Sequence, residues 1–334
     1  MNPLSRRQLA GWLALLLGSA ADRTARAVEA GRPLTPVVFQ LDWKPNVQFA
    51  GLLLAEARGW YREAGLDVVL RPIDADERVV ERVTASTHGL GCCESGVLLA
   101  ARARGEPVQA VGTMFQGTPM CLMSLKARGL THPRQLAGRR VGLHADGNQA
   151  IDLVLASAGL GRRDVSIGLM PHDATLLLNG EYDFAQGYAV DEAVDLELRG
   201  HSLNLLYFHD HGYAAYGQVY FASEAFLARD PATVRRFLEV SHRGWRAAAA
   251  DPDGAARLVV ERHLPGADLE HQRRALRRIL PLLTREGGPR SHGRMRRDTW
   301  RRAVEAYNAL PGIPRPLTVD ELVAFSLPRR PAAP

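Results

Sequence analysis

Two residues near the start of the chain, Trp43 and Asn46, have the chemistry to recognise a flat heterocycle. Residues 36–43 form an apolar, alternating segment that predicts a buried strand ending at Trp43. An indole at that end faces a cleft and can stack on a ring, while an asparagine amide offers both donors and an acceptor. The alternative is that Trp43 is a core residue and Asn46 caps a helix that begins at Gln48.

A second candidate group, Tyr188 to Glu192, lies where a predicted strand ends and a helix begins near Val190. Its side chains therefore belong on the cleft side of their lobe, where Asp191 or Glu192 can accept hydrogen bonds from ring or amine protons. A carboxylate there disfavours an anionic ligand, because two negative charges in a dry cleft repel. The alternative is that these acids only satisfy a helix dipole.

Two helix N-termini are candidate sites for an anion or a polar group. Glu94 and Ser95 begin a helix predicted over residues 95–104, and Asp146, Gly147 and Asn148 precede another. In both places an ordinary capping turn explains the same residues. Glu94, Ser95 and Asn148 therefore enter the set of candidate ligand contacts with that alternative open.

Three further residues, Tyr213, Tyr216 and Gln218, lie where the chain is expected to cross back between lobes. A tyrosine at a hinge can stack on a ligand or pack against its neighbours. Tyr216 is included among the candidate ligand contacts, with packing as the alternative.

Other chemistry finds little support in the sequence. The three cysteines, which include the adjacent pair Cys92 and Cys93, cannot form a disulfide framework and are expected to fill apolar space in strands. The segment 209–211 has two histidines around an aspartate, but no third ligand can be assigned, so we expect a polar turn and no metal site. The role of Cys92-Cys93 is not explained by the sequence.

The elements that must position these residues alternate between strand and helix along the chain. Strands are predicted near residues 36–43, 66–70, 89–93, 108–115, 121–125, 141–143, 165–170, 184–188, 203–208 and 216–222. Beyond Ser223 the pattern is helical, over residues 231–250, 253–263, 269–283 and 297–309. This order predicts an α/β fold of two doubly wound lobes joined by a hinge, with a ligand cleft between them.

The expected organisation has four parts. Residues 1–27 form an export signal, with Arg6 and Arg7 before an apolar run of about 13 residues that is too short to span a membrane. Residues 28–125 form the first part of lobe 1, 126–215 form lobe 2, and 216–334 return to lobe 1 and add C-terminal helices. The signal addresses the protein to the periplasm, by the twin-arginine or the general secretory route.

Composition and net charge limit the kinds of partner that we expect for the protein. The 334 residues are 46% hydrophobic and 23% charged, which is typical of a globular protein. The net charge of +6 falls to about +3 without the leader, and the arginines are scattered, so no nucleic-acid partner is expected.

Several segments carry a resemblance to a known family. They are LDWKPN at 41–46, ARGWYREAGLDV at 57–68, LAARARGEPV at 99–108, LAGRRVG at 136–142, and 231–252 around RGW. Over about residues 36–265 the chain resembles a branch of periplasmic substrate-binding proteins of ABC importers. This branch is related to the fungal thiamine-pyrimidine synthase, and includes formylaminopyrimidine-, riboflavin-, sulfonate-, taurine- and nitrate-binding proteins.

This resemblance implies the type II periplasmic-binding-protein fold, a small-molecule ligand, a membrane ABC permease as partner, and a monomer without a cofactor. The opening motif resembles the pyrimidine-binding members most, which favours a thiamine pyrimidine precursor. In those members a glutamate follows a tyrosine at a similar place, and that ligand-reading role is carried to Glu192.

Two alternatives remain. In a sulfonate, taurine or nitrate receptor, helix N-termini at Ser95 and Asn148 would hold the anion. A pyridoxal-phosphate-dependent hydroxymethylpyrimidine phosphate synthase needs a lysine and a histidine, which the resemblance places at Cys93 and Val97. The only lysines are Lys44 and Lys126.

Overall fold

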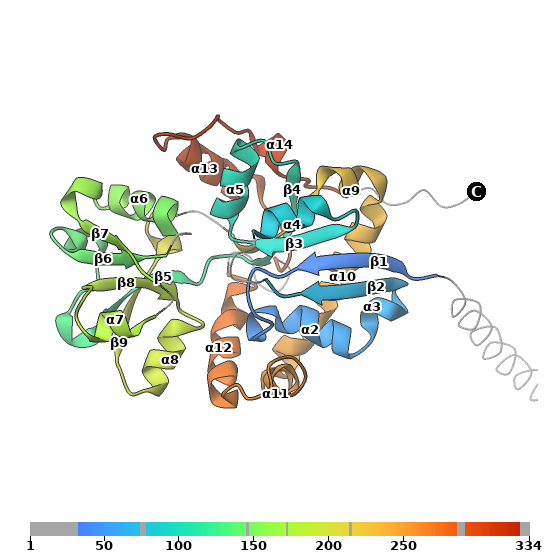
Figure 1. Cartoon of the computed structure of the whole chain (residues 1–334), viewed down its shortest axis with the longest axis horizontal. Coiled ribbons are helices and arrows are strands. Elements are labelled where there is room, and N and C mark those ends of the chain that lie inside the picture. The colour runs from blue at the N-terminus through green and yellow to red at the C-terminus, as the bar shows by residue number, and fades with distance from the viewer. Residues whose placement is uncertain are drawn as a thin grey trace, which may run out of the picture.

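The computed structural model of the chain describes residues 33–73, 78–144, 147–171, 173–213, 216–285 and 291–327. These residues form two lobes, each built on its own sheet (Figure 1). The expected export signal lies outside the described residues. No helix within the described ranges combines the length and the apolar character that crossing a bilayer requires.

The sheet of the first lobe has five strands. They are β1 (Thr35–Gln40), β2 (Leu66–Arg71), β3 (Gly89–Cys93), β4 (Val108–Phe115) and β10 (Gly217–Ser223), in the order β2-β1-β3-β10-β4. β1 is parallel to β2 and β3, and β10 is antiparallel to β3 and β4. β10 breaks the parallel pattern because the chain re-enters this sheet from the second lobe.

The sheet of the second lobe repeats this plan. Its strands are β5 (Met120–Leu125), β6 (Arg140–Leu143), β7 (Ser166–Leu169), β8 (Phe184–Tyr188) and β9 (Leu203–Tyr207), in the order β7-β6-β8-β5-β9. β6 is parallel to β7 and β8, and β5 is antiparallel to β8 and β9. The expected boundary at residue 125 was therefore wrong, because segment 120–125 pairs with the second sheet.

Helices cover both sheets. In the first lobe they are η1 (Val47–Phe49), α2 (Ala50–Ala57), α3 (Trp60–Glu63), α4 (Val79–Ala85), α5 (Ser95–Ala103), α9 (Glu224–Arg229), α10 (Pro231–Ala250), α11 (Pro252–His263), α12 (Leu269–Leu282), α13 (Arg297–Asn308) and α14 (Val319–Leu322). In the second lobe they are η2 (Lys126–Arg128), η3 (Pro133–Leu136), α6 (Gly147–Ser157), η4 (Arg162–Asp164), α7 (Thr175–Leu178), α8 (Glu192–Leu198) and η5 (Phe208–Asp210).

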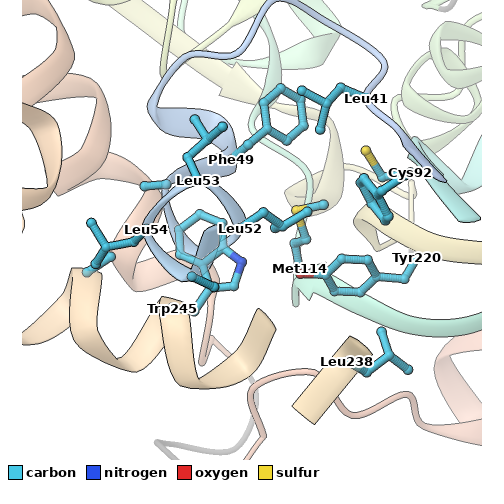
Figure 2. Close-up of a cluster of buried hydrophobic side chains, with 14 of the residues drawn as sticks. Leu41, Phe49, Leu52, Leu53, Leu54, Cys92, Met114, Tyr220, Leu238 and Trp245 are labelled. Carbon is cyan, nitrogen blue, oxygen red and sulfur yellow. The ribbon is translucent and has the colours of Figure 1, made fainter. Parts of the chain in front are cut away.

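The core of the first lobe depends on a close crossing of α2 and α10. Gly51 lies on α2 and Gly244 on α10, and a Cβ atom on Gly244 would lie 1.8 Å from the carbonyl oxygen of Gly51. A Cβ atom on Gly51 would likewise lie 2.3 Å from the ring of Trp245. Figure 2 shows the indole of Trp245 beside the leucines of α2 within this buried cluster. The two glycines therefore allow the helices to meet at backbone contact, with the indole filling the space beside them.

Candidate ligand-binding cavity

A cavity of about 500 Å³ is lined by residues of both lobes. The first lobe contributes Asp42, Trp43, Gln48, Ile73, Arg78, Val79, Val80, Glu81, Cys93, Glu94, Val97, Arg104, Glu106 and Gln218. The second lobe contributes His144, Tyr188, Asp191 and Glu192. This volume is typical of a small-molecule site, and its place between two α/β units is a usual one.

The strand ends explain why these side chains converge. Asp42 and Trp43 follow β1, and Glu94 follows β3 in the first lobe. In the second lobe His144 follows β6 and Tyr188 ends β8. Each of these strands is parallel to its neighbour, so their carboxyl ends meet at one edge of the sheet, which is where α/β proteins bind ligands.

Trp43 and Glu192 line the same cavity from opposite lobes. The indole of Trp43 is half-buried, and Lys44 Nζ lies 5.8 Å from its ring centre. The carboxylate of Glu192 accepts a hydrogen bond from the backbone N–H of Tyr188 at 2.8 Å, which fixes its position at the start of α8. Contact of either side chain with a ligand stays a prediction.

Six carboxyl groups line the cavity, together with the guanidinium groups of two arginines; they belong to Asp42, Glu81, Glu94, Glu106, Asp191, Glu192, Arg78 and Arg104. Glu94 is only 3% exposed. Burial raises the pKa of Asp191, and the negative charge of Glu192 adds to the rise, while Lys44 and His271 oppose it. Because the carboxyl groups outnumber the guanidinium groups, a ligand that donates hydrogen bonds or carries positive charge is favoured over an anion.

The cysteines are buried and free, and two of them adjoin the acids. Burial raises the pKa of the Cys92 and Cys93 thiols well above its usual range, and the charge of Asp42 adds to the rise in both. Burial also raises the pKa of Cys121. Protonated thiols are poor nucleophiles, so these residues act as small apolar fillers, although Cys93 lines the cavity.

The two lobes contact each other at two places. At the N-terminus of α5, the backbone N–H of Gly96 donates to the hydroxyl of Tyr213 at 3.2 Å. At the second place α12 lies between α8 and the helices of the first lobe (Figure 1), and Arg278 donates to the carbonyl of Ala189 at 2.8 Å. His271 Nε2 on the same helix lies 3.4 Å from Asp191 Oδ1.

Comparison with known proteins identifies the family. The sequence model described as NMT1/THI5 like matches residues 46–255. The chain belongs to the NMT1/THI5-like family. This confirms the resemblance seen in the sequence motifs.

Relatives of the chain within the NMT1/THI5-like family carry names from two functional classes. The chain is 30% identical over 278 residues to the riboflavin-binding protein RibY of Chloroflexus aurantiacus, a match that covers 80% of this chain and 78% of RibY. It is 28% identical over 238 residues to the 4-amino-5-hydroxymethyl-2-methylpyrimidine phosphate synthase of Legionella pneumophila, covering 67% of this chain and 73% of the synthase.

A solved structure supports the fold of this NMT1/THI5-like chain. The periplasmic aliphatic sulphonate binding protein SsuA of Escherichia coli is similar with a TM-score of 0.73 at 13% identity, covering 91% of this chain and 96% of SsuA. The predicted two-lobed periplasmic-binding-protein fold is thereby confirmed.

Two of the predicted site residues have structural roles in this member of the family. Asn46 is 5% exposed and does not line the cavity; its Oδ1 accepts from the N–H of Gln48 at 2.9 Å, so it caps η1. Tyr216 is 1% exposed in the core beside Trp300, and its hydroxyl accepts from the N–H of Arg296 at 2.8 Å. In both cases the alternative interpretation of the sequence was correct.

Two further predicted residues gain no place at the cavity. Ser95 begins α5 but is fully buried and absent from the cavity lining. Asn148 lies in α6, and its side chain is outside the described part of the chain, as is Asp146. Of the predicted site residues, the cavity brings together Trp43, Glu94, Tyr188 and Glu192.

Several lining residues were not among the predicted ligand contacts, chiefly His144, and Gln218, which was placed only at the crossing between the lobes. His144 directly follows β6, so the strand-end rule that found Trp43 could have found it. Its Nδ1 lies 3.0 Å from the carbonyl oxygen of Met170, and its backbone N–H donates to Gln186 at 2.9 Å.

Proposed function

We propose that the chain is a solute-binding component of an ABC importer that captures a small aromatic heterocycle with hydrogen-bond donors. The preferred ligand is a thiamine pyrimidine precursor of the hydroxymethylpyrimidine or formylaminopyrimidine type. One observation carries this proposal: a single cavity holds an indole from the first lobe and carboxyl groups from both lobes.

The chemistry of an aminopyrimidine suits this lining. Trp43 provides a face on which the ring stacks, and the exocyclic amine presents two N–H donors that carboxylates accept. Glu192 is held by its hydrogen bond from Tyr188, so it is oriented before the ligand arrives. Binding at the junction of two lobes then favours their closed arrangement.

A sulfonate, taurine or nitrate ligand is less well supported. The anion would be held at the N-terminus of α5. There the N–H of Gly96 already donates a hydrogen bond to the hydroxyl of Tyr213. The residue before that helix is the buried acid Glu94, which repels an anion.

Riboflavin is the second candidate ligand. The relative RibY is named as a riboflavin-binding protein, and an isoalloxazine contains a pyrimidine ring with one N–H between two carbonyl groups. The cavity volume of about 500 Å³ is also compatible with a ligand larger than a pyrimidine. The carboxyl groups of the cavity favour an aminopyrimidine over riboflavin, because the aminopyrimidine presents more N–H donors.

A pyridoxal-phosphate-dependent synthase does not fit the residues present. A Schiff base needs an amine, and no lysine is found among the described residues that line the cavity. The positions that the resemblance assigns to the lysine and the histidine are Cys93 and Val97, and both line the cavity. Lys44 and Lys126 are exposed, and Lys126 lies in η2 of the second lobe. The lining therefore favours a binding role, and the resemblance to components of ABC importers supports a membrane permease as partner and the periplasm as location.

Calorimetric titration with four probes tests the proposal. The probes are 4-amino-5-hydroxymethyl-2-methylpyrimidine, its formylamino relative, riboflavin and taurine. We expect the tightest binding for a pyrimidine and none for taurine. Tightest binding of riboflavin would favour the second candidate, and binding of taurine alone would contradict the heterocycle proposal.

Replacement of Trp43 by alanine should weaken heterocycle binding at least tenfold. Loss of one stacking face costs about 1–3 kcal/mol, by analogy with bases that stack on aromatic side chains. Trp60→Ala is the matched control, because Trp60 lies in α3 under the guanidinium of Arg243 and away from the cavity lining. Equal affinities of the Trp43 and Trp60 variants in calorimetry would remove Trp43 from the site.

A further inference from the structure

Gln218 has an unusual combination of backbone and side-chain features. It is the only non-glycine residue in the described part of the chain with a positive φ, at 53°. Its side chain lines the cavity, yet the residue is only 1% exposed. It occupies the second position of β10, the strand by which the chain returns from the second lobe.

The amide of Gln218 has a defined orientation. Its Nε2 donates to Asp42 Oδ2 at 2.9 Å. Because an ionised carboxylate only accepts hydrogen bonds, the amide must turn its nitrogen toward Asp42 and its oxygen away. The oxygen, Oε1, is buried and has no hydrogen-bond partner among the described residues.

Both features cost free energy in the folded protein. A left-handed backbone at a residue with a Cβ atom is strained, and a buried carbonyl oxygen without a donor loses its hydrogen bond to water. Such costs persist mainly where they serve a site, and here both occur at the wall of the cavity. A ligand in the cavity that brings a donor to Oε1 would remove the second of these costs.

We propose that Gln218 is the specificity-determining acceptor of the cavity, and that its Oε1 accepts an N–H from the edge of the bound heterocycle. Asp42 is the positioning residue, because its carboxylate fixes the direction of the amide. This inference rests on the proposed function and narrows it to heterocycles with an N–H donor on the ring or on an attached amine. An analogue that carries only acceptors at that edge cannot form a hydrogen bond with Oε1.

Two substitutions at position 218 separate a binding role from a structural one. Glycine and asparagine both adopt a positive φ more readily than glutamine, which offsets the loss of the hydrogen bond to Asp42, so Gln218→Gly and Gln218→Asn should change the melting temperature little. Glycine removes the acceptor, and asparagine draws it back by one methylene group. We expect both variants to bind the ligand at least tenfold more weakly than the parent protein.

A ligand analogue shows whether the lost contact is the N–H donor. The probes are 4-amino-5-hydroxymethyl-2-methylpyrimidine and its 4-methoxy analogue, or riboflavin and 3-methylriboflavin if the parent protein prefers the flavin. The parent protein should favour the N–H-bearing probe at least tenfold, and Gln218→Gly should lose most of that preference. Asp42→Asn lets the amide of Gln218 turn over, so it should lower the same preference. The affinity for the N–H-bearing probe should fall more than the affinity for the methoxy or methyl analogue.

The possible outcomes are distinct, with calorimetric affinities and melting temperatures measured together. If the parent protein binds no probe, the proposed function fails and this inference falls with it. If it binds a probe and the Gln218 variants bind equally well, or lose affinity only together with a large fall in melting temperature, the role of Gln218 alone is overturned. Weaker binding and a lost preference for the N–H-bearing probe, at a melting temperature close to that of the parent protein, support it.

Discussion

Gly244→Ala should lower the free energy of unfolding by about 3 kcal/mol, at the upper end of what overpacking costs. The new Cβ atom would lie 1.8 Å from the carbonyl oxygen of Gly51 and 2.7 Å from its carbonyl carbon. Both are backbone atoms of α2, so no side-chain rotation relieves the clash and the two helices must separate. The separation would also open the packing around Trp245, which is fully buried.

This loss of stability is opposite in sign to the effect of the same substitution at an exposed helical position. At an exposed helical position, glycine to alanine stabilises a protein by about 1 kcal/mol, because alanine has the higher helix propensity. Urea unfolding followed by circular dichroism gives the free energy for both proteins. A variant as stable as the parent, or more stable, would show that α2 and α10 do not meet at these two glycines.

Stability should fall as the pH drops from about 6.5 toward 4, because two neighbouring histidines remain neutral in the folded protein. The rings of His242 and His292 are 4.9 Å apart, and the Nε2 atom of each is buried without a hydrogen-bond partner in the described ranges of the chain. Burial, with the nearby charge of Arg246, lowers the pKa of His242 to about 4. Burial, with His242 and Arg246, lowers the pKa of His292 to about 3.

The direction follows from proton uptake. Unfolded histidines protonate near pH 6.5, but these two do so in the folded protein only near pH 4 and below, so acid favours the unfolded chain. Their contribution is fully present above about pH 6.5 and is lost as the pH falls. At full burial the shift would be worth about 3 kcal/mol for His242 and about 5 kcal/mol for His292. Both residues are half-buried and partly screened by water, so we expect about 2–3 kcal/mol for the pair.

The double variant His242→Gln/His292→Gln isolates this effect. It keeps polar side chains at both positions but removes the titrating rings, while the carboxylates that respond to acid are unchanged. Urea unfolding at about pH 7, 6, 5 and 4 should show a shallower loss of stability for the variant than for the parent. Parallel curves would mean that the two histidines do not titrate differently in the folded and unfolded states.

Most of the fold could be predicted because its signals are local. The long helices after Ser223 have apolar positions at helical spacing, and α10 was predicted over its full range, residues 231–250. The predicted strands all exist, but an antiparallel partner is a non-local choice. Segment 120–125 therefore looked like the end of the first lobe, although its backbone pairs with β8 and β9.

The candidate site was predicted where strands end and helices begin. Trp43 and Tyr188 were found at strand ends, Glu94 at a helix N-terminus, and Glu192 through the strand-to-helix junction and the family resemblance. For Asn46 the sequence could not distinguish a ligand contact from a helix cap, since both roles use the same side chain at the same place.

Gln218 could not have been assigned its role from sequence. Its importance comes from a positive φ and from the distant partner Asp42, which the return crossing brings to 2.9 Å. Neither property leaves a local pattern. Tyr216 illustrates the same limit, because its packing against Trp300 joins segments that are far apart in the sequence.

The central claim is that one heterocycle lies between the two lobes, and a crystal structure with bound 4-amino-5-hydroxymethyl-2-methylpyrimidine tests it most directly. We predict electron density for the ring on the indole of Trp43, with its polar edge toward Glu192 and Gln218. A ring bound at the outer surface of either lobe, with this cavity holding only water, would contradict the account.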